Sequence, residues 1–250
     1  MQVIPVLDLL DGHVVRAVRG ERTAYLPIRS SLAATSEPLH IARALLAASG
    51  ARTLYIADLG AILQQGAHVE TLAALRAALP GTDIWLDAGY AEYASTHSLF
   101  ELIDEIGKRN NHSQPAPHDL ATLVPVFGTE SLHDIDALRA AETAGLSPIL
   151  SLDHRAGQLL TAAALEHTSA WWPRRVIAMT LDQVGSYDGP DLATFERIRA
   201  SAPAHTAVIG AGGIRHRDDM TAAERTGASA WLVASALHDR QIGTPFVEST

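Results

Sequence analysis

Two aspartates that end apolar runs are the residues of this chain best suited to chemistry. Asp8 follows the run Val3-Ile-Pro-Val-Leu, and Asp153 follows the run Pro148-Ile-Leu-Ser-Leu. The two aspartates lie 145 positions apart (153 − 8), as do the glycines of the turns that follow them, Gly12 and Gly157. One strand–carboxylate–turn unit that occurs twice predicts two repeats of half a domain. Two carboxyl groups facing a shared site can act as general acid and general base, and we predict this role for the pair.

The composition narrows the functions that such a pair could serve. The formal charge of −9 argues against nucleic acid, because binding to a phosphate backbone depends on Lys and Arg. The absence of cysteine excludes disulfides, thiolate catalysis and zinc–thiolate sites. No apolar run approaches the roughly 20 residues of a membrane span, and the N-terminus lacks the layout of a signal peptide. We expect a cytoplasmic protein without nucleic-acid or membrane partners; whether it is a monomer or a homo-oligomer stays open.

Short apolar runs alternate with Ala- and Leu-rich stretches along the chain. Eight runs are predicted to be strands: Val3–Leu7, Thr53–Ala57, Asp83–Leu86, Leu123–Phe127, Pro148–Leu152, Val176–Thr180, Thr206–Ile209 and Ala230–Val233. Helical spacing predicts helices between them, among others His40–Ala48, Val69–Leu79, Ser131–Ala144 and Leu192–Ala200. This alternation favours a single α/β domain over residues 1–250, a (βα)8 TIM barrel of two half-barrel repeats. The alternative, an open doubly wound sheet, needs a glycine-rich turn where Asp11-Gly12 stands.

Two segments interrupt this alternation. The loop from Asp11 to about Glu37 is long, and long loops in compact domains are often lids or binding elements. The segment 108–119, rich in Asn and Pro, is predicted to be a surface insertion. Its two histidines, His112 and His118, have no third ligand nearby, so we predict no metal site there.

The residues at the ends of the strands are the candidates for function, because β/α barrels carry their sites at the C-terminal ends of the strands. In strand order these ends are Asp8, Asp58, Asp87, Gly128 with Thr129, Asp153, Thr180 with Asp182, Gly212 with Gly213, and Ala234 with Ser235. Carboxylates crowded at one mouth are costly unless they are paired or functional. The competing explanation is an ion pair with Arg16 or Arg155. Strands one and five of eight face each other, so a substrate across the mouth could lose a proton to Asp8 and gain one from Asp153.

The paired glycines after strand seven predict a phosphate site. Without side chains, Gly212 and Gly213 let an anion approach backbone N–H groups. Ala234 and Ser235 after strand eight are small and add a hydroxyl, and barrels commonly hold phosphate after strands seven and eight. A plain tight turn is the alternative. The predicted partner is therefore a phosphorylated small molecule.

These residues resemble the HisA/HisF barrel family of histidine biosynthesis, which comprises the ProFAR isomerase and the imidazole glycerol phosphate synthase cyclase. The resemblance covers nearly the whole chain and is closer to the isomerase. It rests on Asp8-Leu-Leu-Asp-Gly with Arg16, Asp58-Leu-Gly-Ala61, Gly128-Thr129, Ser151-Leu-Asp153, Thr180 and Ala211-Gly-Gly-Ile214. It implies a (βα)8 barrel, a substrate with a phosphate at each end, and a cofactor-free Amadori rearrangement of an aminoaldose into an aminoketose.

The resemblance also implies roles for individual residues. Asp8 removes the C2 proton, Asp153 protonates the ring oxygen, and Thr180 orients the substrate; the acid role of Asp153 requires a raised pKa. The residues expected to bind substrate or phosphate are Arg16, Asp58, Asp87, Gly128, Thr129, Asp182, Gly212, Gly213, Ala234 and Ser235.

Strand three departs from the family pattern. It ends in Asp87-Ala88-Gly89, where the family has a glycine-rich turn for the second phosphate. Two like charges about 4 Å apart repel by roughly 4 kcal/mol at an effective dielectric of 20. This departure favours a paralogue that acts on a monophosphate, similar to an isomerase-related branch associated with tetrahydromethanopterin and methanofuran biosynthesis. A related lyase, a non-catalytic barrel that binds a phosphorylated metabolite, and a metal-dependent hydrolase remain alternatives.

Overall fold

The computed structural model describes residues 1–21, 24–110, 119–161 and 169–243 of the chain. The core of the insertion predicted near 108–119, with His112 and His118, lies outside the described residues. Within the described residues, no helix has both the length and the apolar character needed to cross a bilayer.

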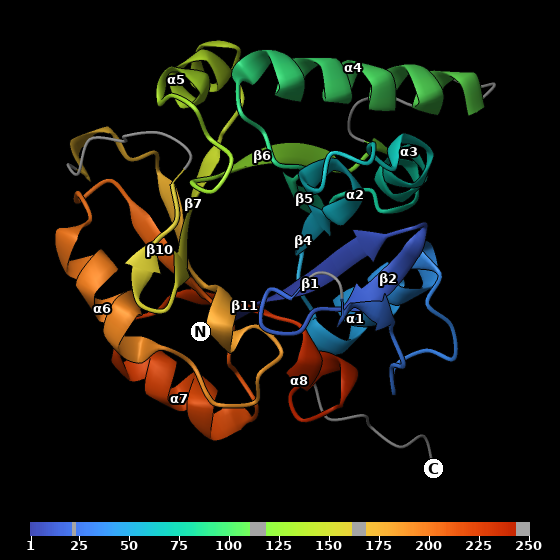
Figure 1. Cartoon of the computed structure of the whole chain (residues 1–250). Helices are drawn as coiled ribbons and strands as arrows, with labels where there is room; N and C mark the ends of the chain where they lie inside the picture. The colour runs from blue at the N-terminus through green and yellow to red at the C-terminus, as the bar shows by residue number, and fades with distance from the viewer. Residues whose placement is uncertain (22–23, 111–118, 162–168, 244–250) are drawn as a thin grey trace.

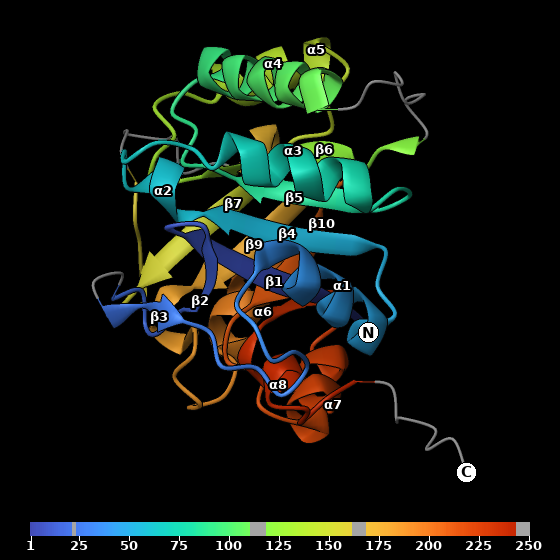
Figure 2. The same cartoon turned by 90° about the vertical axis from the view of Figure 1, so that its right-hand side faces the viewer.

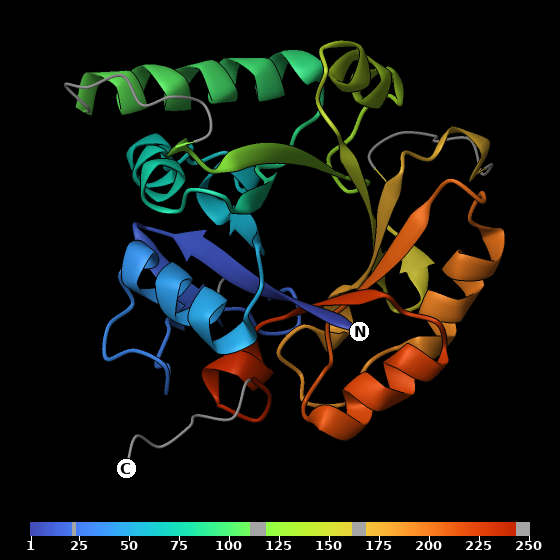
Figure 3. The same ribbon diagram turned by 180° about the vertical axis from the view of Figure 1, so that it is seen from behind.

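Eight parallel strands close into a barrel, as the alternation of elements predicted. In ring order they are β1 (Gln2–Leu10), β4 (Thr53–Asp58), β5 (Asp83–Asp87), β6 (Thr122–Gly128), β7 (Ile149–Arg155), β9 (Arg175–Thr180), β10 (Ala207–Ala211) and β11 (Ala230–Val233). The ring closes where Gln2–Pro5 of β1 pair in parallel with Ala230–Val233 of β11. Figure 1 looks along this ring and shows the helices outside it, and Figure 3 shows the same arrangement from behind. The (βα)8 fold class is confirmed.

The repeat seen in the sequence returns as two matching hairpins. After β1 the chain turns back into β2 (His13–Arg16), and after β7 it turns back into β8 (Gln158–Leu159). Both residues of each turn have positive φ: 50° and 77° at Asp11-Gly12, and 50° and 73° at Ala156-Gly157. Such two-residue turns match the twist of an antiparallel hairpin. Because β1 and β7 lie opposite each other in the ring, the hairpins rise from opposite sides of the barrel. Figure 2 shows that β1 and β7 both end at the left-hand end of the barrel.

Alternation along the strands separates two hydrophobic cores. Successive side chains of a strand point to opposite faces of the sheet. On β1, Ile4 and Val6 face the interior of the barrel, whereas Leu7 and Leu9 face the surrounding helices. The inward positions remain apolar until the last one before the barrel end, where Asp8 follows Val6. The fold thus delivers the carboxylate to the floor of the mouth.

The helices cover the outer faces of the strands. They are α1 (Pro38–Ser49), α2 (Leu59–Ile62), α3 (Val69–Ala78), α4 (Tyr93–Asn110), α5 (Asp136–Thr143), α6 (Leu192–Ser201), α7 (Arg217–Arg225) and α8 (Ser235–His238). Helix α1 begins two residues earlier than predicted, because the Glu37 carboxylate caps the N–H groups of Leu39 and His40. Helix α5 begins five residues later than predicted, and Ser131, its predicted first residue, lines the cavity together with Glu130.

Candidate active site

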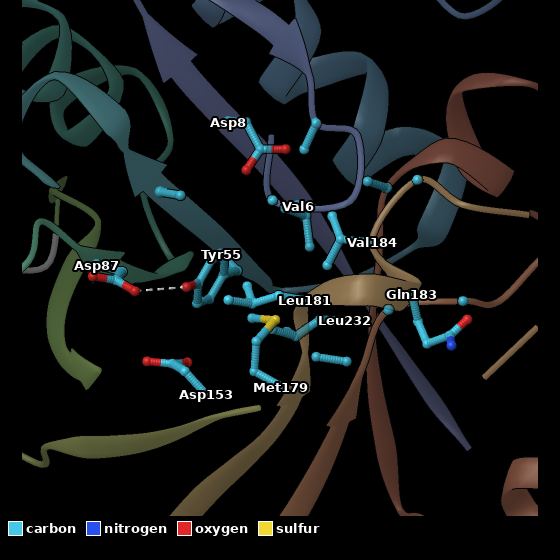
Figure 4. Close-up of a pocket in the computed structure, with 18 of the residues that line it drawn as sticks. Val6, Asp8, Tyr55, Asp87, Asp153, Met179, Leu181, Gln183, Val184 and Leu232 are labelled. Carbon is cyan, nitrogen blue, oxygen red and sulfur yellow. Dashed lines mark hydrogen bonds between the residues drawn. The ribbon is translucent and has the colours of Figure 1, made fainter. Parts of the chain in front are cut away.

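One cavity opens at the barrel end where the strands finish. Eight of the predicted site residues line it: Asp8, Asp87, Gly128, Asp153, Gly212, Gly213, Ala234 and Ser235. The close-up in Figure 4 shows Asp87 and Asp153 at the left, Asp8 at the top and Gln183 at the right, with Leu181 and Val184 between them. The other five predicted residues, Arg16, Asp58, Thr129, Thr180 and Asp182, do not line it.

Asp8 presents its carboxylate to this cavity. Among the described residues, no N–H or O–H group donates a hydrogen bond to it, and no Arg or Lys forms an ion pair with it. Surrounding protein atoms keep bulk water away from the charge, and this burial raises the pKa of Asp8 to about 7. Asp8 is therefore about half ionised at neutral pH and can accept a proton.

Asp153, on the opposite strand, has a different environment and a similar pKa. Burial and the charge of Asp87 raise its pKa to about 7, although two hydrogen bonds favour the ionised form. Ser151 Oγ donates to Oδ1 at 2.7 Å, and the Glu130 N–H donates to Oδ2 at 3.3 Å. The side chain is thus held in one orientation and can still carry a proton near pH 7, as a general acid requires.

Asp87 occupies the mouth at the end of β5. The Tyr55 hydroxyl donates to its Oδ2 at 3.0 Å, and the Gly89 N–H donates to its Oδ1 at 3.1 Å. A Cβ atom on Gly128 would lie 2.7 Å from Asp153 Oδ2 and 3.9 Å from Asp87 Oδ2, so Gly128 separates the two carboxylates. Their closeness explains why the charge of Asp87 raises the pKa of Asp153.

The end of β10 has no charged side chain. Gly212 and Gly213 both have positive φ, 85° and 81°, a conformation that L side chains rarely adopt. A Cβ on Gly213 would lie 2.2 Å from the Gly189 carbonyl oxygen, so close packing of the loop after β9 also requires glycine. Ser235 lies beside them at the start of α8. Small residues thus leave backbone N–H groups at this end of the cavity accessible to an anion.

Asp58 has a structural position outside the lining of the cavity. It lies on the outward face of β4, fully buried, two residues after the outward Ile56. Its carboxylate accepts from the N–H groups of Ala61 and His68 at 3.2 and 2.9 Å, and contacts His68 Nδ1 at 2.7 Å. Asp58 therefore caps α2 and ties it to α3, and its expected contact with substrate stays a prediction.

Arg16 and Asp182 connect loops. The Arg16 guanidinium donates to both carboxylate oxygens of Asp239, at 2.7 and 3.2 Å, and to the Tyr187 hydroxyl at 2.6 Å. Asp182 accepts from the Ala156 N–H at 2.6 Å and so pins the β7–β8 hairpin to the loop after β9. Their expected role in substrate binding is not supported by these positions.

The two threonines also lie outside the cavity. Thr180 is buried on β9, and its neighbours Met179 and Leu181 line the cavity in its place. Thr129 is fully buried, and its hydroxyl accepts a hydrogen bond from the Asp153 N–H at 3.0 Å. Thr129 therefore holds the backbone of Asp153 in place, and its expected contact with substrate stays a prediction.

Tyr55 and Glu130 are the main lining residues that sequence reasoning missed. Strand alternation could have identified Tyr55, because it lies two positions before Ala57 on the same face of β4. Glu130 directly follows Gly128-Thr129. It was not predicted to line the site, because a helix was expected to begin at the next residue, Ser131. In the described ranges, no group of three or more His, Cys, Asp or Glu is arranged to hold a metal ion.

Comparisons with known proteins agree with this architecture. An uncharacterized protein of Methanocaldococcus jannaschii is 27% identical over 249 residues, 95% of this chain and 93% of the relative. Relatives from Nitrosopumilus maritimus and Herpetosiphon aurantiacus are 26% and 27% identical, and each alignment covers 97% of this chain. The alignments cover 96% and 95% of these relatives. Both carry names that end in imidazole-4-carboxamide isomerase and specify two 5-phosphoribosyl groups.

The model of one family extends over almost all of the sequence. It is described as histidine biosynthesis protein, and it matches residues 2–243, which include every strand of the barrel and every residue that lines the cavity. The chain therefore belongs to the histidine biosynthesis protein family.

Proposed function

We propose that this protein is an isomerase that converts an aminoaldose into an aminoketose on a phosphorylated, ribosylamine-type metabolite. The observation that carries the proposal is the pair Asp8 and Asp153, which reach one cavity from opposite strands and have pKa values of about 7. The isomerase names of two relatives support the reaction class.

Each carboxyl group has a defined step in this reaction. Protonated Asp153 donates to the ring oxygen; the C1–O bond breaks, and the nitrogen lone pair forms a C1=N bond. Ionised Asp8 removes the C2 proton, and the electrons of the C–H bond form C1=C2 and neutralise the iminium. The enolamine takes a proton at C1 and loses one from its C2 hydroxyl, which yields the ketose and restores both carboxyl groups. Hydrogen is only redistributed within the substrate, so the chemistry consumes no cofactor.

The phosphate of the substrate is assigned to Gly212, Gly213 and Ser235. These residues combine positive φ, missing side chains and a hydroxyl at one end of the cavity. An anchor there places the sugar over Met179 and Leu232 on the cavity floor, between the two carboxyl groups (Figure 4). Thr180 is left out of this mechanism, because its side chain does not line the cavity.

A second candidate is a paralogue that acts on a substrate with one phosphate. Asp87 lines the cavity where the two-phosphate substrate of the family would place its other anion. The resemblance to barrels associated with one-carbon carrier cofactors fits this candidate. The two candidates share the acid/base pair and the phosphate anchor. They differ in which part of the substrate lies beside Asp87 at the end of β5: a second phosphate or a group without one.

A test of turnover with ProFAR, the substrate of the isomerase in the family, separates the histidine-pathway isomerase from the paralogue. The purified protein is incubated with ProFAR, and the isomers are separated by chromatography; in D₂O, the product should carry deuterium at C1. Turnover that disappears in Asp8→Asn and Asp153→Asn, and persists in the exposed control Asp136→Asn, supports the histidine-pathway isomerase. Phosphate binding without ProFAR turnover supports the paralogue. Full ProFAR turnover in both active-site variants contradicts the assignment of the pair.

A further inference from the structure

Tyr55 places a buried hydroxyl among the carboxyl groups of the cavity. Its ladder partners are Val6 on β1 and Trp85 on β5. Asp8 and Asp87 follow these partners by two positions, so they lie on the same inward face, one layer nearer the mouth. The Tyr55 ring rises from the lower layer to the upper one, because its Oη donates to Asp87 Oδ2 at 3.0 Å (Figure 4).

Ala57 gives this ring the space to rise. It is the next inward residue of β4, it pairs with Asp8 on β1 and with Asp87 on β5, and it lines the cavity together with Tyr55. A methyl group in this position leaves room above the floor that a larger side chain would fill. The Tyr55 hydroxyl therefore lies at the level of the proposed acid/base pair and not at the bottom of the barrel.

The oxygen of this hydroxyl has an unused acceptor position. A phenol hydroxyl donates one hydrogen bond and can accept another. Tyr55 donates to Asp87, and within residues 1–21, 24–110, 119–161 and 169–243 no N–H or O–H group donates to Tyr55 Oη. Only 3% of the Tyr55 surface is exposed, and polar atoms buried to this degree normally form the hydrogen bonds available to them. Since Tyr55 lines the cavity, a ligand there can supply the missing donor.

The Tyr55 hydroxyl keeps its proton while the carboxyl groups around it titrate. Burial, followed by the negative charges of Asp87, Asp153 and Asp8, raises the pKa of Tyr55 well above its usual value of 10. The influence of these charges also shows that the hydroxyl lies within electrostatic range of both members of the proposed acid/base pair. A group that stays neutral cannot serve as the base, but it can hold the substrate by hydrogen bonding wherever the pair is active.

From these positions we infer that Tyr55 is a further catalytic residue, whose hydroxyl oxygen accepts a hydrogen bond from the C2 hydroxyl of the sugar. In the proposed function, on which this inference rests, C2 is the carbon that loses its hydrogen to Asp8. The phosphate anchor holds the C5 end of the sugar, and Tyr55 fixes a second point beside the reacting carbon. With both points held, the C2–H bond is directed at the carboxylate of Asp8 on the neighbouring strand. Tyr55 thus makes the orienting contact that the resemblance assigns to Thr180, which does not line the cavity.

Two sugar phosphates test this contact. Ribose 5-phosphate and 2-deoxyribose 5-phosphate carry the same phosphate and differ only in the C2 hydroxyl. The affinity of the protein for each is measured by titration calorimetry. We expect the wild type to bind ribose 5-phosphate about three- to tenfold more tightly than the deoxy sugar, which corresponds to one hydrogen bond.

Tyr55→Phe removes the hydroxyl and keeps the buried ring. This variant should bind the two sugar phosphates with equal affinity. The ratio of the two affinities, compared between wild type and variant, isolates the contact, because a displacement of Asp87 that affects both sugars alike cancels. The matched control is Tyr93→Phe on α4, where the ring stacks on His97 and does not line the cavity. The control should keep the wild-type ratio.

Turnover gives a second measurement. With a substrate that the wild type isomerises, Tyr55→Phe should lower kcat about ten- to a hundredfold, because C2 is no longer held against Asp8. Tyr93→Phe should keep the wild-type kcat. A wild-type kcat in Tyr55→Phe overturns the inference.

The binding outcomes separate this inference from the proposed function. Equal affinity of the wild type for the two sugar phosphates overturns the inference and leaves the isomerase proposal intact. A preference for ribose 5-phosphate that persists in Tyr55→Phe means that another group contacts the C2 hydroxyl, and a preference that also disappears in Tyr93→Phe shows a general effect; each overturns the inference. If neither sugar phosphate binds and inorganic phosphate does not bind either, the phosphate anchor is wrong. The proposed function then loses its substrate class, and the inference fails with it.

Discussion

The two halves of this barrel start alike and end differently. β1 and β7 each deliver an inward aspartate and then turn back in a hairpin with the same positive-φ dihedrals. The third strand of the N-terminal half, β5, ends in Asp87, whereas the third strand of the C-terminal half, β10, ends before Gly212-Gly213. Equivalent places in one repeated unit thus present a carboxylate in one half and bare backbone in the other.

This contrast separates the chemistry from the recognition. Two opposed carboxyl groups suffice for acid/base catalysis, and neither half alone contains both. In the proposed function, the strand ends that flank them contact the far parts of a substrate, and they can change without disturbing Asp8 or Asp153. A chain can therefore keep the reaction class of its family while it changes which substrate it accepts.

The largest expected effect comes from removing the charge of Asp8 or Asp153, the two aspartates proposed to be catalytic. The folded state raises the pKa of each to about 7 from an ordinary value of 3.8, so folding favours the protonated carboxyl. The associated stability is complete below about pH 4 and is lost as the pH rises through 7. Asp8→Asn and Asp153→Asn should each raise the free energy of unfolding at pH 8 by up to about 4 kcal/mol, while turnover falls about 10²- to 10⁴-fold.

Urea unfolding at pH 8 and at pH 4.5 measures this effect. The gain should fall to about 1 kcal/mol at the lower pH, because the carboxyl is then protonated in the folded state but still largely ionised in the unfolded state. Asp136→Asn, an exposed control, should change stability by less than about 0.5 kcal/mol at either pH. Equal effects at both pH values would show that packing, and not ionisation, accounts for the change.

The next largest effect is expected from a substitution in the N-terminal half, at Gly128, that displaces Asp153, the proposed general acid in the C-terminal half. In Gly128→Ala, the new Cβ would lie 2.7 Å from Asp153 Oδ2, closer than such contacts occur, so the carboxylate must move. Displacing a catalytic group by a fraction of an ångström should reduce turnover about ten- to a hundredfold. Gly107→Ala on α4, where a Cβ meets nothing within 4 Å, should leave turnover unchanged. Wild-type turnover in Gly128→Ala would show that the placement of Asp153 tolerates this shift.

A smaller effect is expected from the hydrogen bond that distinguishes the two aspartates, which have similar pKa values in different surroundings. Asp153 accepts a hydrogen bond from Ser151, and the equivalent residue two positions before Asp8 is Val6. Ser151→Ala removes a bond to the ionised form, so the pKa of Asp153 should rise by about one unit. Val6→Ser offers Asp8 such a bond and should lower its pKa. NMR titration of labelled carboxyl carbons in each variant measures both shifts; an unchanged Asp8 in Val6→Ser would break the equivalence of the halves.

The sequence predicted the barrel correctly and placed Asp8 and Asp153 at one cavity, because both features depend on short-range patterns; the catalytic role of the two aspartates stays a prediction. Eight apolar runs and the spacing of Asp8 and Asp153 are visible in the chain, and strand alternation places such residues on the inward face. The pattern did not show that Asp58 lies outside the cavity, because one step along a strand reverses the face. It also did not show that Arg16 and Asp182 lie outside it, because their partners, Asp239 and Ala156, come from other loops. Contacts between loops depend on side-chain packing in three dimensions, which spacing along the chain does not encode.

The smallest expected effect tests Arg16, which joins the two halves at the rim. Its guanidinium pairs with Asp239 through two hydrogen bonds at about 28% exposure, whereas the Arg19–Asp188 pair is about half exposed. Arg16→Ala should therefore lower the free energy of unfolding by about 1 kcal/mol, and Arg19→Ala by less than about 0.5 kcal/mol. Because Arg16 is occupied by Asp239 and lies outside the cavity, KM should change less than about threefold. A tenfold or larger rise in KM for Arg16→Ala, with Arg19→Ala unchanged, would mean that Arg16 leaves Asp239 to bind substrate, and the rim would then belong to the recognition surface of the C-terminal half.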